Sequence, residues 1–319
     1  MDVLYLVVQQ TMFFSIPLLI VALGGMFTER GGVTNIALDG TMIMGAFASI
    51  YFINQMQDSM SGQVLLILAI LVAVVVGAVF SLLLAYSAVN MKADQIIGGT
   101  ALNMFAPAFA IYVARMIQAD GVQQITFLNT FRIASVPVLG DIPVIGSLFF
   151  KNAYITTYIG FTILIISVIV LYKTRFGLRL RACGEHPHAA DSVGINVYRM
   201  RYAGVMISGG LAGLGGLVFV IPTSTNFNAT VAGYGFLALA VMIFGQWKPI
   251  RILFAAFFFG LMKTIASAYS VIPILATLNI SSDIYKMVPF IATLIVLAFS
   301  SKSSQAPRAV AVPYDKGSR

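Results

Sequence analysis

The chain has 319 residues, of which 59% are apolar and only 9% are charged. A soluble domain carries about 25% charged residues, so this composition excludes an ordinary soluble globular protein and predicts a polytopic membrane protein. The net charge of +8 therefore does not indicate nucleic-acid binding, and we expect no nucleic-acid partner. We expect most basic residues in loops beside the anionic headgroups of membrane lipids.

The apolar runs predict an all-α transmembrane helical bundle of about nine spans, with a range of eight to ten, forming a single domain over residues 1–300. The predicted spans are residues 3–27, 36–53, 64–90, 96–118, 153–172, 203–221, 232–246, 250–270 and 284–300. Several of them, notably 232–246, are shorter than a full crossing. Such segments can be broken helices where protein or a cavity covers the backbone.

A basic segment from Lys173 to Arg201 sets the predicted orientation. It holds six of the 19 Lys and Arg residues, both His residues and the single Cys. Basic loops stay on the cytoplasmic side, and alternation of the spans then places 14 of the 19 Lys and Arg there. An N-terminus outside and a C-terminus in the cytoplasm follow. Because Asp2 and no basic residue precede the first apolar run, we expect no cleaved signal peptide.

Two segments are predicted to lie outside the membrane domain's spans as longer polar stretches. Residues 119–152, which contain Pro and Gly at several positions, are expected to form an ordered extracellular loop over the pore mouth. Residues 301–319 are rich in Ser, Pro and charge, and we expect a disordered cytoplasmic tail.

The centre of the basic segment has the pattern of a short helix. Pro187 suits a first helical turn, Glu185 favours the positive end of the helix, and Gly194 can end it in a left-handed conformation. We expect about two turns lying across the membrane face as a docking surface. A plain solvated connector is the alternative.

Several kinds of chemistry have no support in the sequence. Cys183 is alone, which predicts no disulfide, and His186 with His188 lacks the spacing of a metal site. We find no candidate catalytic residues. No GxxxxGK[ST] phosphate loop occurs, and the run GGLAGLGGL at 209–217 is expected to allow close helix packing instead. If the protein uses ATP, we therefore expect a separate chain to hydrolyse it.

The basic segment resembles part of a known family. The pattern RAxGExPxAAxxxGINVxRxR looks like the cytoplasmic loop of ABC-importer permeases of the branched-chain amino acid, ribose and nucleoside group. In that family the short helix is the coupling helix, which docks in a groove of the ATPase subunit. The resemblance implies this role for Glu185, Pro187, Ala189, Ala190, Gly194 and Ile195.

Three further segments resemble the nucleoside branch. They are ERGGVTNIALDGTMIMGAF (29–47), KADQIIGGTALN (92–103) and GYGFLALAVMIFGQWKP (233–249). Asp39 stands where Glu is usual and Ala37 where Gly is usual. The resemblance implies an importer of nucleosides in a bacterial cell membrane, with an extracytoplasmic binding protein, a second permease chain in a heterodimer, and ATPase subunits that bind the ATP and Mg²⁺. No cofactor is expected in this chain.

The substrate pathway is sought among polar and aromatic residues of the spans, because polar groups there usually face a pathway or a partner helix. The candidates are Asp39, Asn35, Thr100, Asn103, Phe27 and Phe236. Asp39 either faces the pathway or is a buried partner of Asn35, Asn103 or Arg30. Thr100 and Asn103 either bind a ribose hydroxyl or base edge or join helices, and the two Phe rings are candidates for stacking on a nucleobase.

Other functions remain open from the residues. Ribose, galactose or a branched-chain amino acid would need only local changes along the pathway. An ion-coupled secondary transporter would use Asp39 and Lys263 to bind its coupling ion. An intramembrane enzyme is disfavoured because no paired carboxylates, HExxH or Ser/Lys arrangement occurs in the spans.

Overall fold

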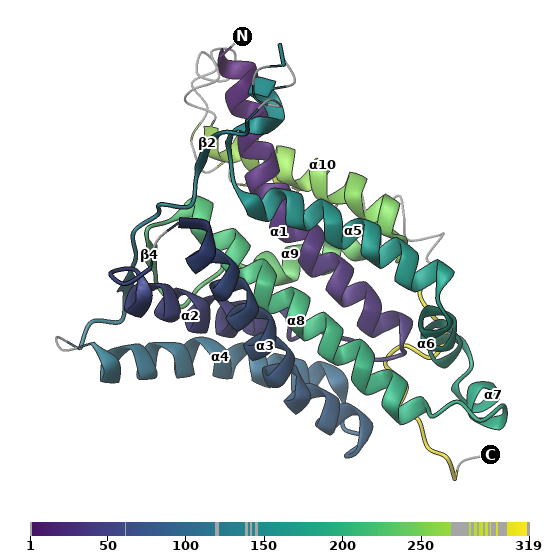
Figure 1. The fold of residues 1–319 in the computed structure, drawn as a ribbon. Coiled ribbons are helices and arrows are strands. Elements are labelled where there is room, and N and C mark those ends of the chain that lie inside the picture. The colour runs from purple at the N-terminus through teal and green to yellow at the C-terminus, as the bar shows by residue number, and fades with distance from the viewer. Residues whose placement is uncertain are drawn as a thin grey trace.

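A computed structural model of the chain describes residues 2–60, 62–118, 121–137, 140, 142–143, 146–268, isolated positions between 281 and 298, and residues 305–317. Its long helices cross one another in a bundle (Figure 1). They are α1 (Asp2–Arg30), α2 (Leu38–Met56), α3 (Gly62–Val89), α4 (Gln95–Ile117), α5 (Ile155–Lys173), α8 (Val197–Thr223) and α10 (Pro249–Ala268). Three shorter helices are α6 (Arg175–Glu185), α7 (Pro187–Ser192) and α9 (Tyr234–Phe244).

Six helices in the described part of the chain are long and apolar enough to cross a membrane: α1 from Leu4 onward, α3, α4, α5, α8 and α10. The prediction of a helical, polytopic protein is thereby confirmed. Helices α2 and α9 coincide with the predicted spans 36–53 and 232–246, but α2 carries Asp39, Asn54 and Gln55, and α9 has only 11 residues. The predicted span 284–300 lies largely outside the described residues, so nine spans stay a prediction.

Helix α8 lies at the centre of the bundle against α1, α2 and α3 (Figure 1). Its small residues bring the backbones together: a Cβ added at Gly213 would overlap the Ala73 carbonyl, and one added at Gly45 would overlap Gly213 itself. Close contact between helix backbones is how small residues stabilise membrane helix pairs. The close packing predicted for the 209–217 run is confirmed.

The connections between helices gather at two ends of the bundle. At one end, Arg30 contacts Glu185, Lys92 contacts Asp315, and Trp247 hydrogen-bonds to Glu29. These contacts bring together segments that alternation of the spans assigns to the cytoplasmic side.

At the opposite end, the loops that alternation assigns to the outside meet. The side chain of Asn54 donates to the Thr126 carbonyl, and that of Gln63 donates to the Phe131 carbonyl. Strand β1 (Ile125–Thr126) pairs antiparallel with β4 (Asn226–Phe227), and β2 (Ile133–Ser135) pairs with β3 (Lys151–Ala153), beside a π-helical turn η2 (Gly146–Phe150). The described part of the 119–152 segment is thus tied to α2, α3 and the end of α8.

The end of the chain differs from the disordered tail expected over 301–319. Within the described residues 305–317, Ala309 and Tyr314 are buried against the segment that carries α6 and α7. The physical reason is that a few apolar side chains and backbone hydrogen bonds secure a polar segment on a preformed surface. Composition averaged over the tail does not reveal such a surface.

Candidate functional site

The short helix predicted inside the basic segment is present with its predicted boundaries. Helix α7 begins at Pro187 in its first turn and runs to Ser192. Gly194 has a φ of +83°, and its N–H donates to the Asp191 carbonyl at 2.9 Å, while the Ile195 N–H donates to the Ala190 carbonyl at 3.1 Å. These hydrogen bonds satisfy carbonyls that the end of a helix leaves free, and the left-handed residue is one that glycine adopts without strain.

The six candidate coupling residues divide between an exposed and an inner face. Ala189 and Gly194 are exposed, and Val193 between them is 75% exposed. Glu185, Pro187 and Ile195 are half-buried, and Ala190 is buried against Cys183, Val197 and Tyr314. Ala190 therefore packs the helix onto its support, and the exposed face offers Ala189, Val193 and Gly194.

Helix α6 joins α7 to the end of α1. The Thr174 side chain accepts from the Gly177 N–H at 3.2 Å and starts α6. At the other end of α6, Gly184 lies so close to the Arg30 carbonyl that a Cβ there would overlap it. Burial also raises the pKa of the adjacent Cys183 to about 11, so its thiol stays protonated at neutral pH.

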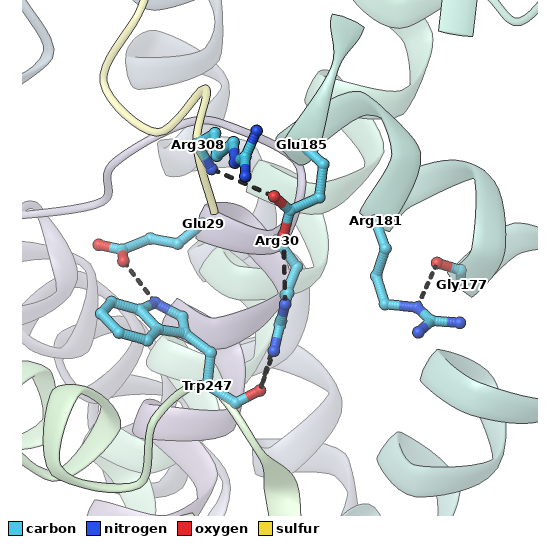
Figure 2. A network of polar contacts seen from close by, with 7 residues as sticks. All are labelled: Glu29, Arg30, Gly177, Arg181, Glu185, Trp247 and Arg308. Atoms are coloured by element: carbon cyan, nitrogen blue, oxygen red, sulfur yellow. Dashed lines mark hydrogen bonds and ion pairs between the residues drawn. The ribbon is translucent and has the colours of Figure 1, made fainter. Parts of the chain in front are cut away.

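A polar network connects this loop to the turn between α9 and α10 (Figure 2). The Arg30 guanidinium lies 3.8 Å from the Glu185 carboxylate and donates from Nη2 to the Trp247 carbonyl at 3.1 Å. The Trp247 indole N–H donates to the Glu29 carboxylate at 2.6 Å, and Glu29 is only 6% exposed. A series of polar contacts therefore runs from Glu185 at the end of α6, through the end of α1, to the turn after α9.

The sequence analysis did not assign a role to Glu29 or Trp247. Trp247 is the only tryptophan of the chain, and it lies in the 233–249 segment that carries the family resemblance. Gln246 and Trp247 both have a φ of +53°, so the turn holds two non-glycine residues in the left-handed region. A unique aromatic residue within a family motif is the signal that could have identified this turn.

Three predicted pathway residues surround the start of α2, where they join helices. Asp39 accepts from the Gly235 N–H at 2.8 Å, a partner from α9 that the sequence analysis did not name. Asn103 accepts from the Gly40 N–H at 2.7 Å and donates to the Ile36 carbonyl at 2.8 Å, which fixes α4 against α2. Asn35, in turn, donates to the Ser208 hydroxyl of α8 at 2.9 Å.

The other three predicted pathway residues are dispersed. Phe27 is buried in the main hydrophobic core, and Thr100 is exposed on α4 with its hydroxyl donating to the Ile96 carbonyl at 2.8 Å. Phe236 is 50% exposed and lines a cavity of about 450 Å³ at the start of α9. The structure therefore does not bring the six residues into one site.

Among the described residues, that cavity combines aromatic rings with the Lys263 ammonium. Tyr234 and Phe236 line it from α9 and Lys263 from α10, together with Pro289 and Leu294. The Lys263 ammonium lies 6.0 Å from the centre of the Tyr234 ring, and the centre of the Phe219 ring lies 4.1 Å from that of Tyr234. The cavity is also lined by Ala232 and Gly233, which belong to the non-helical residues between β4 and α9. Interrupted membrane helices often carry binding sites at such points.

Comparisons with known proteins identify the family of this chain. The family model described as "Branched-chain amino acid transport system / permease component" matches residues 7–297. The guanosine ABC transporter permease protein NupQ of Bacillus subtilis is 41% identical over 319 residues, covering 100% of this chain and 99% of the relative. The nucleoside ABC transporter permease protein NupC of Lactococcus lactis is 41% identical over 316 residues, covering 99% and 98%.

A more distant relative, the nucleoside ABC transporter permease protein NupB of Lactococcus lactis, is 26% identical over 259 residues, covering 78% of this chain and 69% of the relative. No solved structure matches the chain. The family model spans most of the chain and the first two relatives match over its full length. The chain belongs to the family of ABC transporter membrane permeases that includes the permease components of branched-chain amino acid transport systems.

Proposed function

We propose that this chain is the permease subunit of an ATP-driven nucleoside importer in a bacterial cell membrane. The observation that carries the proposal is the identity of 41% over the full length to two permeases, one described for guanosine and one for nucleosides. Import of ribose, galactose or a branched-chain amino acid is the alternative within the same family.

We propose that α7 docks in an ATPase subunit, which binds the ATP and Mg²⁺. The exposed face of Ala189, Val193 and Gly194 supports this, because an apolar face left in water on a rigid element suits a protein partner. The contacts from Glu185 through Arg30 to Trp247 offer a route by which a shift of α7 would reach α9. Two packed arrangements of this route would be the basis of alternating access.

The partners follow from the same assignment. Lactococcus lactis has two relatives that share a nucleoside permease description, NupC and NupB, which supports a heterodimer of this chain with a second permease. An extracytoplasmic binding protein would deliver the substrate to the end of the bundle that carries β1 to β4. With nine spans, the excess of Lys and Arg falls at the opposite end, which supports an N-terminus outside and a C-terminus in the cytoplasm.

We place the substrate next to Phe236 in the cavity at the start of α9. Its aromatic rings suit stacking on a nucleobase, which every base permits through its π-face. Asp39, Asn35 and Asn103 would then act by fixing the helices around this cavity. Thr100 and Phe27 lie outside it.

The substrate is tested by ATP hydrolysis in proteoliposomes that hold the complete importer and its cognate binding protein. Guanosine, adenosine, cytidine and uridine are compared with free ribose, galactose and leucine. We expect stimulation by at least one nucleoside. Stimulation by a free sugar or by leucine, and by no nucleoside, would refute the nucleoside assignment.

The docking role of α7 is tested in the same system with Ala189→Trp, which places a large ring on its exposed face. The matched control is Leu178→Trp, an exposed apolar position of α6 on the same loop. We expect Ala189→Trp to abolish transport while insertion into the membrane is unchanged, and Leu178→Trp to transport like the wild type. Equal transport by both variants would contradict docking through α7.

A further inference from the structure

The C-terminal segment, residues 305–317, lies on the loop that carries α7. The Ala309 N–H donates to the Gly184 carbonyl at 2.8 Å, next to the start of the coupling residues. The guanidinium of Arg201, a residue of α8 that is 1% exposed, donates to the Val312 carbonyl at 3.0 Å. The segment is therefore held by its backbone to both α6 and α8.

Ion pairs extend these contacts to two more elements. The Lys92 ammonium, in the connection between α3 and α4, lies 2.9 Å from the Asp315 carboxylate. The Lys316 ammonium lies 4.0 Å from the Asp191 carboxylate of α7. The C-terminal segment thus bridges α7, its supporting helices and the neighbouring connection of the bundle.

Tyr314 is the buried aromatic side chain of this segment that packs against α7. It is 4% exposed and forms a small hydrophobic cluster with Cys183, Ala190 and Val197. Its ring centre lies 5.1 Å from that of His188 in α7 and 5.4 Å from that of Tyr198 in α8.

Helix α7 needs such support. It has six residues, and isolated helices shorter than about 12 residues are marginal in water, so packing has to supply its stability. Ala190 is its one buried residue, and the Tyr314 ring forms one wall of the cluster around Ala190. Without that ring, Ala190 would face a gap and α7 would lose a fixed position.

We propose that the C-terminal segment holds α7 in its docking position and that Tyr314 is the positioning residue. This rests on the proposed docking of α7 to an ATPase subunit. Tyr314 touches neither substrate nor ATP. It acts by keeping the exposed face of α7 in one orientation, so that movement of the ATPase is passed to the bundle rather than absorbed by a loose helix.

The single cysteine provides a direct probe of this packing. Cys183 is fully buried in the cluster with Tyr314, and its thiol stays protonated at neutral pH. The rate at which a maleimide labels Cys183 in the full-length chain in nanodiscs therefore reports how often the cluster opens. The labelled fraction is measured by mass spectrometry, as the increase in the mass of this chain on reaction with maleimide.

Three variants distinguish the roles of ring, hydroxyl and general tail contact. We expect Tyr314→Ala to raise the labelling rate of Cys183 about tenfold and Tyr314→Phe, which keeps the ring, to leave it near the wild-type rate. Val312→Ala is the control within the segment, because the Val312 side chain is 54% exposed and only its carbonyl binds Arg201. Unchanged labelling in Tyr314→Ala, or an equal rise in Val312→Ala, would overturn the inference.

The functional arm measures substrate transported per ATP hydrolysed by the complete importer, with guanosine as the probe. We expect Tyr314→Ala to lower this ratio several-fold, with Tyr314→Phe restoring it, while the amount of membrane-inserted protein stays constant. A wild-type ratio in Tyr314→Ala overturns the inference even if labelling rises. If Ala189→Trp transports normally, the docking proposal itself fails; if it does not and Tyr314→Ala does, only the positioning role fails.

Discussion

The contact between α8 and α3 allows one prediction to be worked out in detail. A Cβ added at Gly213 would overlap the Ala73 carbonyl and lie 3.0 Å from the Gly77 Cα. All of these atoms belong to backbone and cannot rotate away. The Gly213→Ala variant therefore has to separate the two helices.

The same helix offers a matched control one turn earlier. A Cβ at Gly210 would meet the Val74 Cγ1 at 3.2 Å and the Val74 carbonyl at 3.4 Å, and the side-chain contact can give way. Gly210→Ala and Gly213→Ala gain the same helix propensity, about 1 kcal/mol. That gain cancels in the comparison of the two variants. Overpacking typically costs about 1–3 kcal/mol, so we expect Gly213→Ala to be less stable than Gly210→Ala by about that amount.

The measurement is thermal unfolding of the detergent-solubilised protein at one fixed scan rate, because membrane proteins often unfold irreversibly and the midpoint then depends on the rate. At about 2–4 °C per kcal/mol, the midpoint of Gly213→Ala should lie several degrees below that of Gly210→Ala. Equal midpoints, or a more stable Gly213→Ala, would show that α8 and α3 are not in backbone contact and would refute the reasoning.

Three further predictions concern the polar contacts. Trp247→Phe keeps an aromatic ring but leaves the Glu29 carboxylate without its indole donor, so we expect the free energy of unfolding to fall by about 1.5–3 kcal/mol and transport to weaken. Glu29→Gln keeps an acceptor for the indole N–H and should lose less stability, and equal losses in the two variants would count against the hydrogen bond. Asp39→Ala should destabilise the start of α9 by about 1–2 kcal/mol and Asp39→Asn by less, since an amide oxygen still accepts from the backbone N–H; unfolding midpoints distinguish them, and identical midpoints would refute the bridging role. Lys92 holds the pKa of Asp315 below its usual range, so the ion pair stabilises the docked C-terminal segment above pH about 4 and this contribution is lost as the pH falls through the lowered pKa. The measurement is hydrogen exchange of the segment's amides, corrected for intrinsic rates. In the wild type, exchange should become faster as the pH falls below about 4, and in Lys92→Met it should already be faster at pH 7. Protection that does not depend on pH in either protein would contradict the ion pair.

The sequence predicted the features that depend on neighbouring residues. Proline, alanine and glycine at 187–194 specify where α7 begins and ends, because a missing N–H and a left-handed glycine act within a single turn. The run of small residues at 209–217 indicated close packing of α8, since the absence of side-chain volume is visible in the sequence itself. The family motifs predicted the permease family, and the family model that matches residues 7–297 confirms it.

The partners of polar residues could not be predicted. Asp39 accepts from a backbone N–H of α9 that is 196 residues away, and every residue of the chain except proline offers such a group. The predicted pathway residues were chosen for chemical type, and chemical type alone does not state whether a polar atom is already satisfied. The structure places Asn35, Asp39 and Asn103 in hydrogen bonds between helices and leaves only Phe236 on the cavity.

By itself the sequence determined a helical membrane protein of the ABC permease family, with a basic loop containing a short helix. Hydropathy, charge and local turn chemistry depend on residues that are neighbours in the sequence, so the sequence alone predicts them. Only the tertiary structure decided that Glu185, Arg30, Trp247 and Glu29 form one network and that the C-terminal segment covers Cys183 and Ala190. Those contacts join residues more than 100 positions apart, and each depends on how the helices pack and on which polar groups burial leaves in need of a partner.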